Sequence, residues 1–297
     1  MALDPRRIFG RLSKDIPRPL HPHIFIVGSL AAAYHFRARL EGRAVNTKDA
    51  DVVVYPAGDI RSSRVLAQEL LTAGWRRTPE CRPMGKASPA HELRAIRLYP
   101  PGSGDYFVEL LGLPRRRQLG KLVWIPVHLS DGWYGVGCHR FMSLNAFRRL
   151  KSPEGLEYSS PAMMALANLL SHPEVGPQRM GTPVQGRTIL RSAKDLGRVL
   201  ALAWLAGRDA AEGWLENWVE GLRRYFPGSW RAHARNAGRG LQDLMGNEEA
   251  MEEARITTDV GLLNGRGVTV DNLRAVGDRI MADLVLPLAD RAKRRPT

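Results

Sequence analysis

Two aspartates stand two positions apart, directly before a β-branched run at residues 52–55. Because alternate side chains of a strand point to the same face, Asp49 and Asp51 are predicted to lie side by side where this strand begins. Neighbouring carboxylates repel each other unless a cation or a shared proton neutralises them. Mg²⁺ accepts carboxylate oxygens together with substrate phosphates. The spacing therefore suits a divalent-metal site, although a solvated strand end explains an isolated Asp-x-Asp equally well.

A glycine and a serine, Gly28 and Ser29, follow the apolar run at residues 24–27. A glycine at the end of a buried strand permits a tight turn and lets a phosphate approach the backbone. The helix expected from Leu30 would direct its free N–H groups and its dipole toward that phosphate, and the serine adds a hydroxyl donor. Taken alone, an ordinary N-cap serine is the better interpretation. Together with the two carboxylates on the next strand, the turn predicts a phosphate and metal site at one end of adjacent strands.

The elements around these residues indicate an α/β (α+β) domain with a mixed sheet. Apolar and β-branched runs predict strands, and stretches of helix formers predict helices that glycines end. The expected order is a strand at 24–27, a helix at 30–40, a strand at 52–55, a helix at 62–73, strands at 93–99 and 106–111 joined by the turn-rich 100–104, and short strand-like pieces at 122–136.

Beyond Ser160 the sequence becomes almost wholly helical. Helices are expected at 161–170 and 189–205, with a loop at 172–186, and Gly, Asn and Pro break the remainder at 227–228, 246–247 and 264–265. We therefore expect an N-terminal arm or short helix at residues 1–22, an α/β domain at 23–155 and a helical domain at 156–297.

The charge of the chain points to a polyanionic partner. Its 297 residues carry 44 Lys and Arg against 30 Asp and Glu, a formal net charge of +14, and such a field attracts nucleic acid. Two isolated cysteines, Cys81 and Cys138, support neither a disulfide framework nor a zinc site. No apolar stretch reaches the length of a membrane span, and the N-terminus does not read as a signal peptide, so we expect a cytoplasmic protein.

Two stretches of the sequence resemble a known superfamily. IVGSLAAAYHFRARLEGRAVNTKDADVVV is similar to the signature of polymerase-β-fold nucleotidyltransferases, in which Gly-Ser or Gly-Gly precedes a helix and a T-x-D-x-D strand follows. ALANLL, a loop and then RSAKDLGRVLALAWL resemble the helical signature of the AbiEii and MenT group of toxin nucleotidyltransferases. The resemblance covers roughly residues 23–112 and 160–205. It implies a polymerase-β-like nucleotidyltransferase domain at 23–155, followed by the helical domain.

The resemblance assigns roles to individual residues. It implies that Asp49 and Asp51 bind two catalytic Mg²⁺ ions and that Gly28 and Ser29 hold the triphosphate of an NTP. Further nucleotide contacts would come from the T-x-D-x-D residues Thr47 and Lys48 and from the helical pair Lys194 and Asp195. Glu109, on the later strand, is the candidate for the third metal-binding and catalytic acid, since an unpaired carboxylate among apolar neighbours would be costly. A strand-edge glutamate paired to an arginine is the alternative.

The activity implied is transfer of an NMP from an NTP to an acceptor hydroxyl, with RNA, by analogy a tRNA 3′ end, as the acceptor and an antitoxin protein as a partner. The toxin group has a lysine where this chain has Ala162, so the basic contact to the nucleotide would have to come from another residue such as Lys194, Arg191 or Lys151. Two alternatives stay open: a nucleotidyltransferase acting on a small molecule or a protein, and a non-catalytic protein of the same fold that binds nucleic acid or a partner.

Overall fold

A computed structural model describes residues 4–40, 47–115, 122–175, 178–181 and 183–294 of the chain. The chain divides into two compact units. The first contains Met1–Tyr34 and Asn46–Ser159, and the second contains His35–Val45 and Ser160–Thr297. The second unit therefore takes in a short stretch from the N-terminal half of the sequence.

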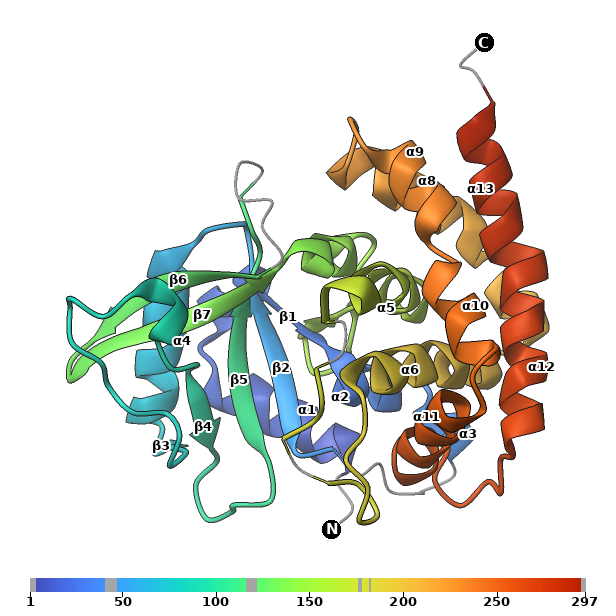
Figure 1. The fold of residues 1–297 in the computed structure, drawn as a ribbon. Coiled ribbons are helices and arrows are strands. Elements are labelled where there is room, and N and C mark those ends of the chain that lie inside the picture. The colour runs from blue at the N-terminus through green and yellow to red at the C-terminus, as the bar shows by residue number, and fades with distance from the viewer. Residues whose placement is uncertain (1–3, 41–46, 116–121, 176–177, 182, 295–297) are drawn as a thin grey trace. The chain divides into compact units, whose positions relative to one another are not determined.

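All nine strands of the sheet lie in the first unit (Figure 1). They are β1 (Ile24–Val27), β2 (Asp49–Val54), β3 (Arg76–Arg77), β4 (Arg97–Tyr99), β5 (Phe107–Gly112), β6 (Leu122–Leu129), β7 (Gly132–His139), β8 (Leu150–Lys151) and β9 (Glu157–Tyr158). The order along the sheet is β3-β4-β5-β2-β1-β9-β8, and the β6–β7 hairpin joins it through a pairing of β7 with β5.

The centre of the sheet positions the residues singled out in the sequence. β2 lies between β1, to which it is antiparallel, and β5, to which it is parallel. Its second half, Val52, Val53 and Val54, is buried on both faces, as the β-branched run predicts. In this register Asp51 stands opposite Val27 on one side and Glu109 on the other. The end of β1, the start of β2 and the middle of β5 thus meet.

The described residues of this unit form the α-helices α1 (Pro5–Asp15), all but the last residue of α2 (Gly28–His35), and α4 (Ile60–Thr72). Short 3-10 turns occupy Arg18–His23, Ala90–Glu92 and Arg140–Ala146. Asp4 caps α1 by accepting a hydrogen bond from the backbone N–H of Arg6, and the buried ring of Phe9 stacks on Tyr34 at 3.9 Å between centroids. Most of the segment expected as an arm or short helix is therefore helical and contributes to the core of the first unit.

The second unit is helical in the part that the structure describes. Its helices are α3 (Arg37–Leu40), α5 (Pro161–Val175), α6 (Arg191–Ala206), α7 (Arg208–Glu212), α8 (Trp214–Tyr225), α9 (Trp230–Asn236), α10 (Arg239–Met245), α11 (Glu248–Val260), α12 (Val270–Ile280) and α13 (Leu286–Lys293), with a π-helical turn at Met281–Val285. α6 packs against α5 and α11, and a Cβ at Gly197 would lie 3.0 Å from the carbonyl oxygen of Ala254, so the absence of a side chain permits the close approach of α11.

A mixed-sheet α/β part followed by a helical part confirms the expected fold class. Two predicted elements were wrong in detail. The helix expected at 30–40 breaks at Phe36, whose carbonyl accepts the N–H groups of both Arg39 and Leu40 and so starts a new turn. The strand expected at 93–99 is reduced to β4, because only a single bridge, Ala95 to Gly135, ties its first half to the sheet.

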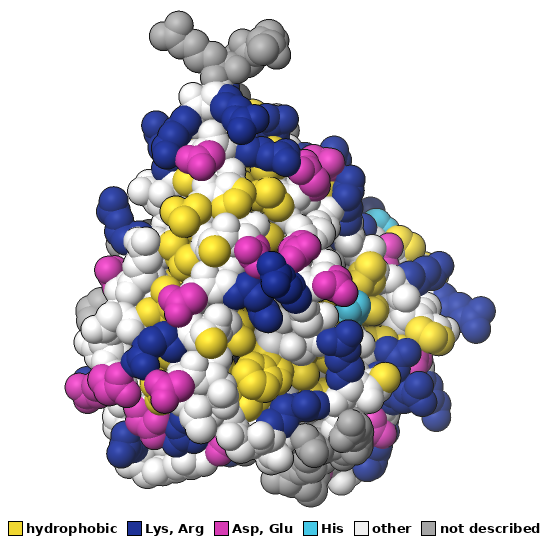
Figure 2. Space-filling model, turned by 90° about the vertical axis from the view of Figure 1, so that its right-hand side faces the viewer, with side chains coloured by type: hydrophobic (Ala, Val, Ile, Leu, Met, Phe, Trp, Pro, Cys, Tyr) yellow, Lys and Arg dark blue, Asp and Glu magenta, His cyan; other side chains and the backbone are white. Residues whose placement is uncertain are grey.

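Basic side chains do not gather into one patch on the face of the second unit that Figure 2 shows. Lys and Arg (dark blue) are interspersed there with acidic and hydrophobic side chains. Salt bridges pair several arginines of the second unit with acidic residues, including Arg274 with Glu248 and Arg291 with Glu216. Among the residues that the structure describes, no helix has the length and apolar character needed to cross a membrane.

Candidate active site

The two aspartates of the T-x-D-x-D stretch lie on β2, with half-buried side chains on the same face of the sheet. The hydroxyl of Thr47 donates a hydrogen bond of 2.7 Å to Oδ1 of Asp49. Thr47 is itself buried, with 7% of its surface exposed. This bond helps to hold the carboxylate of Asp49 in place.

The Gly28 turn lies directly against the second carboxylate. Gly28 has a φ of +74°, in the left-handed region that favours glycine, and it follows the last residue of β1. A Cβ added at this position would stand 2.6 Å from Oδ2 of Asp51. Ser29 is the second residue of α2, so the N-terminus of that helix opens beside the carboxylate. The structure thus brings the Gly28 turn and the carboxylate of Asp51 into contact, as expected from the sequence for adjacent strands.

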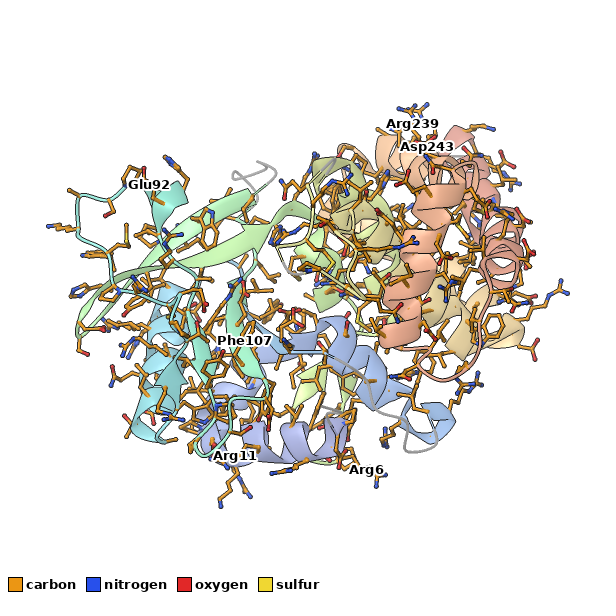
Figure 3. The ribbon with its side chains drawn as sticks, turned by 60° about the horizontal axis from the view of Figure 1, so that its bottom comes forward. Arg6, Arg11, Glu92, Phe107, Arg239 and Asp243 are labelled. Atoms are coloured by element: carbon orange, nitrogen blue, oxygen red, sulfur yellow. The ribbon has the colours of Figure 1, made fainter. Side chains whose placement is uncertain are left out.

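Glu109 lies on the same face, because it stands directly opposite Asp51 in the β2–β5 register. Its Oε2 accepts a hydrogen bond of 2.7 Å from Nε of Arg97, which faces it from β4. The guanidinium of Arg97 also lies over the ring of Phe107, the residue labelled on β5 in Figure 3, at 5.4 Å from the ring centroid. Glu109 therefore has an arginine partner, which was the alternative interpretation of this residue.

Arg97 is a site residue that the sequence reasoning missed. Burial lowers the pKa of its guanidinium, but the charge of Glu109 and the hydrogen bond to it outweigh burial and raise that pKa. Glu80 and Asp49 add to the rise, so the positive charge of Arg97 is felt across the acidic face. The sequence predicted a hairpin around the turn at residues 100–104 but not its register, and the register determines that position 97 pairs with position 109.

The structure does not bring Asp49, Asp51 and Glu109 together as three ligands of one metal ion. Among the described residues, no three His, Cys, Asp or Glu side chains are grouped closely enough to hold a metal ion. The carboxylate of Glu109 is instead engaged in an ion pair with Arg97. Asp49 and Asp51 remain a fitting pair for Mg²⁺, which is commonly bound by one or two carboxylates together with substrate phosphates and water.

The other predicted nucleotide contacts lie apart along the chain. Lys48 is exposed just before β2. Lys194 and Asp195 lie near the start of α6 and belong to the second unit. Asp195 Oδ1 is 3.9 Å from the guanidinium of Arg198, one turn further along the same helix. Ala162, at the position where the toxin group has a lysine, is buried, and its carbonyl accepts a hydrogen bond of 2.7 Å from Trp218.

Two solved structures are similar to this chain over nearly its whole length. CdnE from Capnocytophaga granulosa, a STING-associated c-di-GMP synthase, is 12% identical with a TM-score of 0.25, and the match covers 99% of this chain and 84% of that one. The CD-NTase CdnG from Bradyrhizobium diazoefficiens, solved in complex with GTP, is 12% identical with a TM-score of 0.22, and the match covers 98% of each chain. No protein-family model and no curated protein matches the chain. Neither structure bears on the toxin group, and with TM-scores this low the case for function rests on the site residues alone.

Proposed function

We propose that the chain is a Mg²⁺-dependent nucleotidyltransferase that moves an NMP from an NTP to an acceptor hydroxyl. The observation that carries this proposal is the contact between the Gly28 turn and the carboxylate of Asp51, with Asp49 on the same face. A phosphate-binding turn and a pair of carboxylates within reach of one another are the two parts that such a site needs. The motif IVGS followed by TKDAD, typical of polymerase-β-fold nucleotidyltransferases, supports the same assignment.

The residues of the turn bind the triphosphate. The backbone N–H groups at the start of α2, where the helix dipole favours negative charge, would bind the phosphate oxygens. Ser29 adds a hydroxyl donor at the same place. Asp49 and Asp51 would hold Mg²⁺, which when bound neutralises the phosphates and lowers the pKa of an attacking hydroxyl. The hydrogen bond from Thr47 keeps Asp49 in a single orientation before substrate binds.

In the reaction, the acceptor oxygen forms a bond to the α-phosphorus while the bond from that phosphorus to the pyrophosphate oxygen breaks. Glu109 is the further carboxylate on this face, and we assign it to the proton of the acceptor hydroxyl. Its ion pair with Arg97 orients this carboxylate. The protein then acts by positioning the reactants and compensating charge, with no covalent intermediate.

RNA is the acceptor class that the charge of the chain favours. A net charge of +14, carried mostly by arginine, attracts a polyanion and provides forked contacts to phosphate. A tRNA 3′ end is the acceptor implied by the resemblance of the sequence to toxin nucleotidyltransferases.

Transfer can be measured directly with purified protein, Mg²⁺, NTPs labelled at the α-phosphate, and total tRNA. We expect labelled RNA with the wild-type protein and loss of at least about 10²-fold of the rate with Asp49→Asn or Asp51→Asn. Asp105→Asn, which changes an exposed aspartate in the β4–β5 turn of the same unit, should label RNA normally. Undiminished labelling by both site variants would overturn the assigned site.

A non-catalytic binding protein on this fold is the second candidate, and two observations favour it. Ala162 replaces the lysine of the toxin group and is buried, so no basic side chain can act from this position. In addition, Glu109 is engaged by Arg97 rather than converging with the aspartates. A non-catalytic protein with this altered site should bind no Mg-NTP, so a measurement of Mg-NTP binding distinguishes it from a nucleotidyltransferase.

A further inference from the structure

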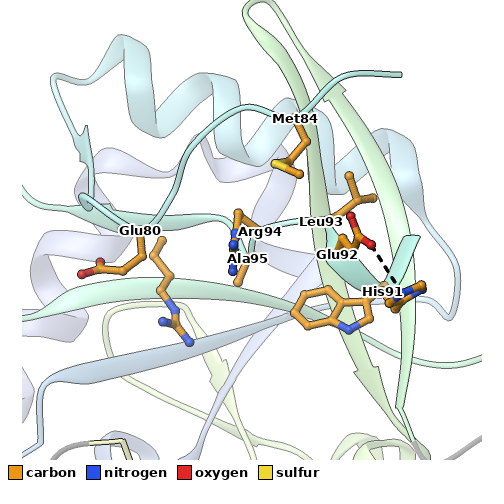
Figure 4. A pocket seen from close by; sticks show the side chains of 9 residues that line it. Glu80, Met84, His91, Glu92, Leu93, Arg94 and Ala95 are labelled. Carbon is orange, nitrogen blue, oxygen red and sulfur yellow. Dashed lines mark ion pairs between the residues drawn. The ribbon is translucent and has the colours of Figure 1, made fainter. Parts of the chain in front are cut away.

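A pocket of about 600 Å³ opens in the first unit where the segment before β4 lies beside the β6–β7 hairpin (Figure 4). Its walls include Trp124 from β6, Leu93 and Arg94 from the segment before β4, and Arg97 from β4 itself. This volume lies within the range of small-molecule sites, and a nucleobase with its sugar fits within it.

The indole of Trp124 is set into the hairpin by two glycines of β7. Trp124 stands opposite Gly137, and a Cβ at that position would lie 3.7 Å from its benzo ring. A Cβ at Gly135 would lie 2.6 Å from Cε3 of the same ring, so no side chain could stand there with the ring in place. The glycines therefore let one part of the indole rest on the strand, while the half-buried side chain lines the pocket.

The pocket opens on the acidic face of the sheet. Gly137 pairs with Leu111 of β5, and Leu111 is two residues beyond Glu109. Since side chains two apart on a strand share a face and directly paired residues share a face, Trp124 lies on the same face as Glu109 and Asp51. Arg97 joins the two places physically, because it lines the pocket while its Nε bonds to Glu109.

The charges around the pocket are balanced. Arg94 and Arg97 are matched by Glu80 and Glu92, and Glu92 pairs with His91 at 3.8 Å, the ion pair drawn in Figure 4. Such a lining does not select a bare phosphate. It suits a neutral aromatic ring that carries both hydrogen-bond donors and acceptors at its edge, with the exposed Arg94 beside it for a neighbouring phosphate.

We propose that Trp124 is a stacking platform for a base of single-stranded RNA, and that this base belongs to the acceptor strand whose end is presented to the acidic face. The role of this RNA as the acceptor strand rests on the proposed function, whereas binding of RNA at this pocket does not. Stacking on an indole tolerates every base, so the platform would position the strand without selecting its sequence.

Binding is measured first, without NTP, as the fluorescence anisotropy of a fluorescein-labelled single-stranded RNA oligonucleotide. We expect Trp124→Ala to weaken binding about tenfold and Trp124→Phe, which keeps a stacking ring, to stay within about threefold of wild type. Trp133→Ala removes another half-buried tryptophan of the same hairpin that does not line the pocket, and it should leave the Kd unchanged. Circular dichroism and Tm identify any variant that has lost the fold.

Steady-state kinetics then test the role in transfer. We expect Trp124→Ala to raise the KM for RNA by about the same factor as its Kd and to leave the KM for NTP unchanged. Wild-type affinity for RNA in the folded Trp124→Ala variant overturns the platform, and so does a KM effect confined to the NTP. RNA binding that depends on Trp124 in a protein with no transfer activity supports the platform and refutes the proposed enzyme.

Discussion

At position 28 the chain requires a residue without a side chain for two separate reasons. The backbone has a φ of +74°, which costs other residues about 1–2 kcal/mol. The space where a Cβ would lie is occupied by Oδ2 of Asp51 at 2.6 Å. The backbone conformation affects the stability of the fold, and the close contact affects the position of the Asp51 carboxylate. Substitutions at two different glycines can separate these two effects.

Gly28→Ala is expected to lower the free energy of unfolding by about 1–2 kcal/mol and to reduce transfer by about 10²-fold, because the carboxylate of Asp51 must move. The matched variant is Gly102→Ala, where φ is +72° and nothing lies within 4 Å of the added Cβ. It should lose similar stability and keep its activity. Chemical denaturation and the labelling assay measure the two effects. Equal activity in both variants would show that contact with Asp51 is unimportant.

Arg97 and a bound cation compete for the negative charge of this face. With Arg97→Gln, the Glu109 carboxylate loses the guanidinium that now lies 2.7 Å away, and three acids are left without that positive charge. We expect the Tm without metal to fall and the rise in Tm on adding Mg²⁺ to exceed that of wild type, since a ligand that binds only the folded state stabilises it. Thermal melts with EDTA and with Mg²⁺ give both values.

Arg149→Gln is the control for that experiment. Arg149 forms a comparable pair with Glu157 at 2.6 Å in the same unit, without contacting the aspartates. Its loss should lower the Tm without changing the response to Mg²⁺. An equal Mg²⁺ response in wild type and Arg97→Gln would argue against metal binding at Asp49 and Asp51.

At the scale of elements, the sequence was informative where local signals agreed. The apolar and β-branched runs and the Gly-Ser turn predicted β1, β2 and the start of α2, and the breaks at 227–228 and 246–247 lie just beyond the ends of α8 and α10. The break of the first helix at Phe36 had no such signal, because no glycine or proline stands there. The pairing of Glu109 with Arg97 also had none at short range, since it depends on the register between β4 and β5.

The packing of α5 against α10 makes the stability of the second unit depend on pH. His172 of α5 lies against Gly240 of α10, and its Nδ1 is 2.8 Å from the carbonyl oxygen of Leu169. Burial lowers the pKa of His172 from 6.5, although the Leu169 carbonyl, Asp243 and Asp195 oppose the shift. Below pH 6.5 the unfolded chain therefore binds more protons at this position than the folded one. The stability that the buried, neutral His172 contributes is complete above pH 6.5 and is lost as the pH falls through the lowered pKa of the folded state.

His172→Gln should consequently lose less stability than wild type between pH 7.5 and pH 5.5. The difference between the two slopes can reach about 1.4 kcal/mol per pH unit for a single proton. His91→Gln changes a histidine whose side chain is 78% exposed, and it should follow the wild-type curve. Urea denaturation at a series of pH values measures the slopes. Identical slopes for His172→Gln and wild type would mean that burial does not shift this histidine.

At the scale of the whole molecule, composition predicted a polyanion partner but could not say where it binds. On the face of the second unit in Figure 2, basic residues are mixed with acidic ones. The pocket at Trp124 depends on contacts between β6, β7 and the segment before β4. These segments are separate in the sequence, so no local pattern predicts the pocket. Lys194 and Asp195 stay predictions as nucleotide contacts, since they belong to the second unit while the Asp49–Asp51 pair belongs to the first.

The central claim is that Asp49 and Asp51, beside the Gly28 turn, form a site for a metal-bound triphosphate. Isothermal titration of each Mg-NTP into the purified protein tests it without assuming any acceptor. We expect one binding site in wild type for at least one NTP, no binding when EDTA replaces Mg²⁺, and no binding in a folded Asp49→Asn, Asp51→Asn double variant. Absence of binding for all four NTPs in the wild type, or equal affinity in the double variant, would contradict the account.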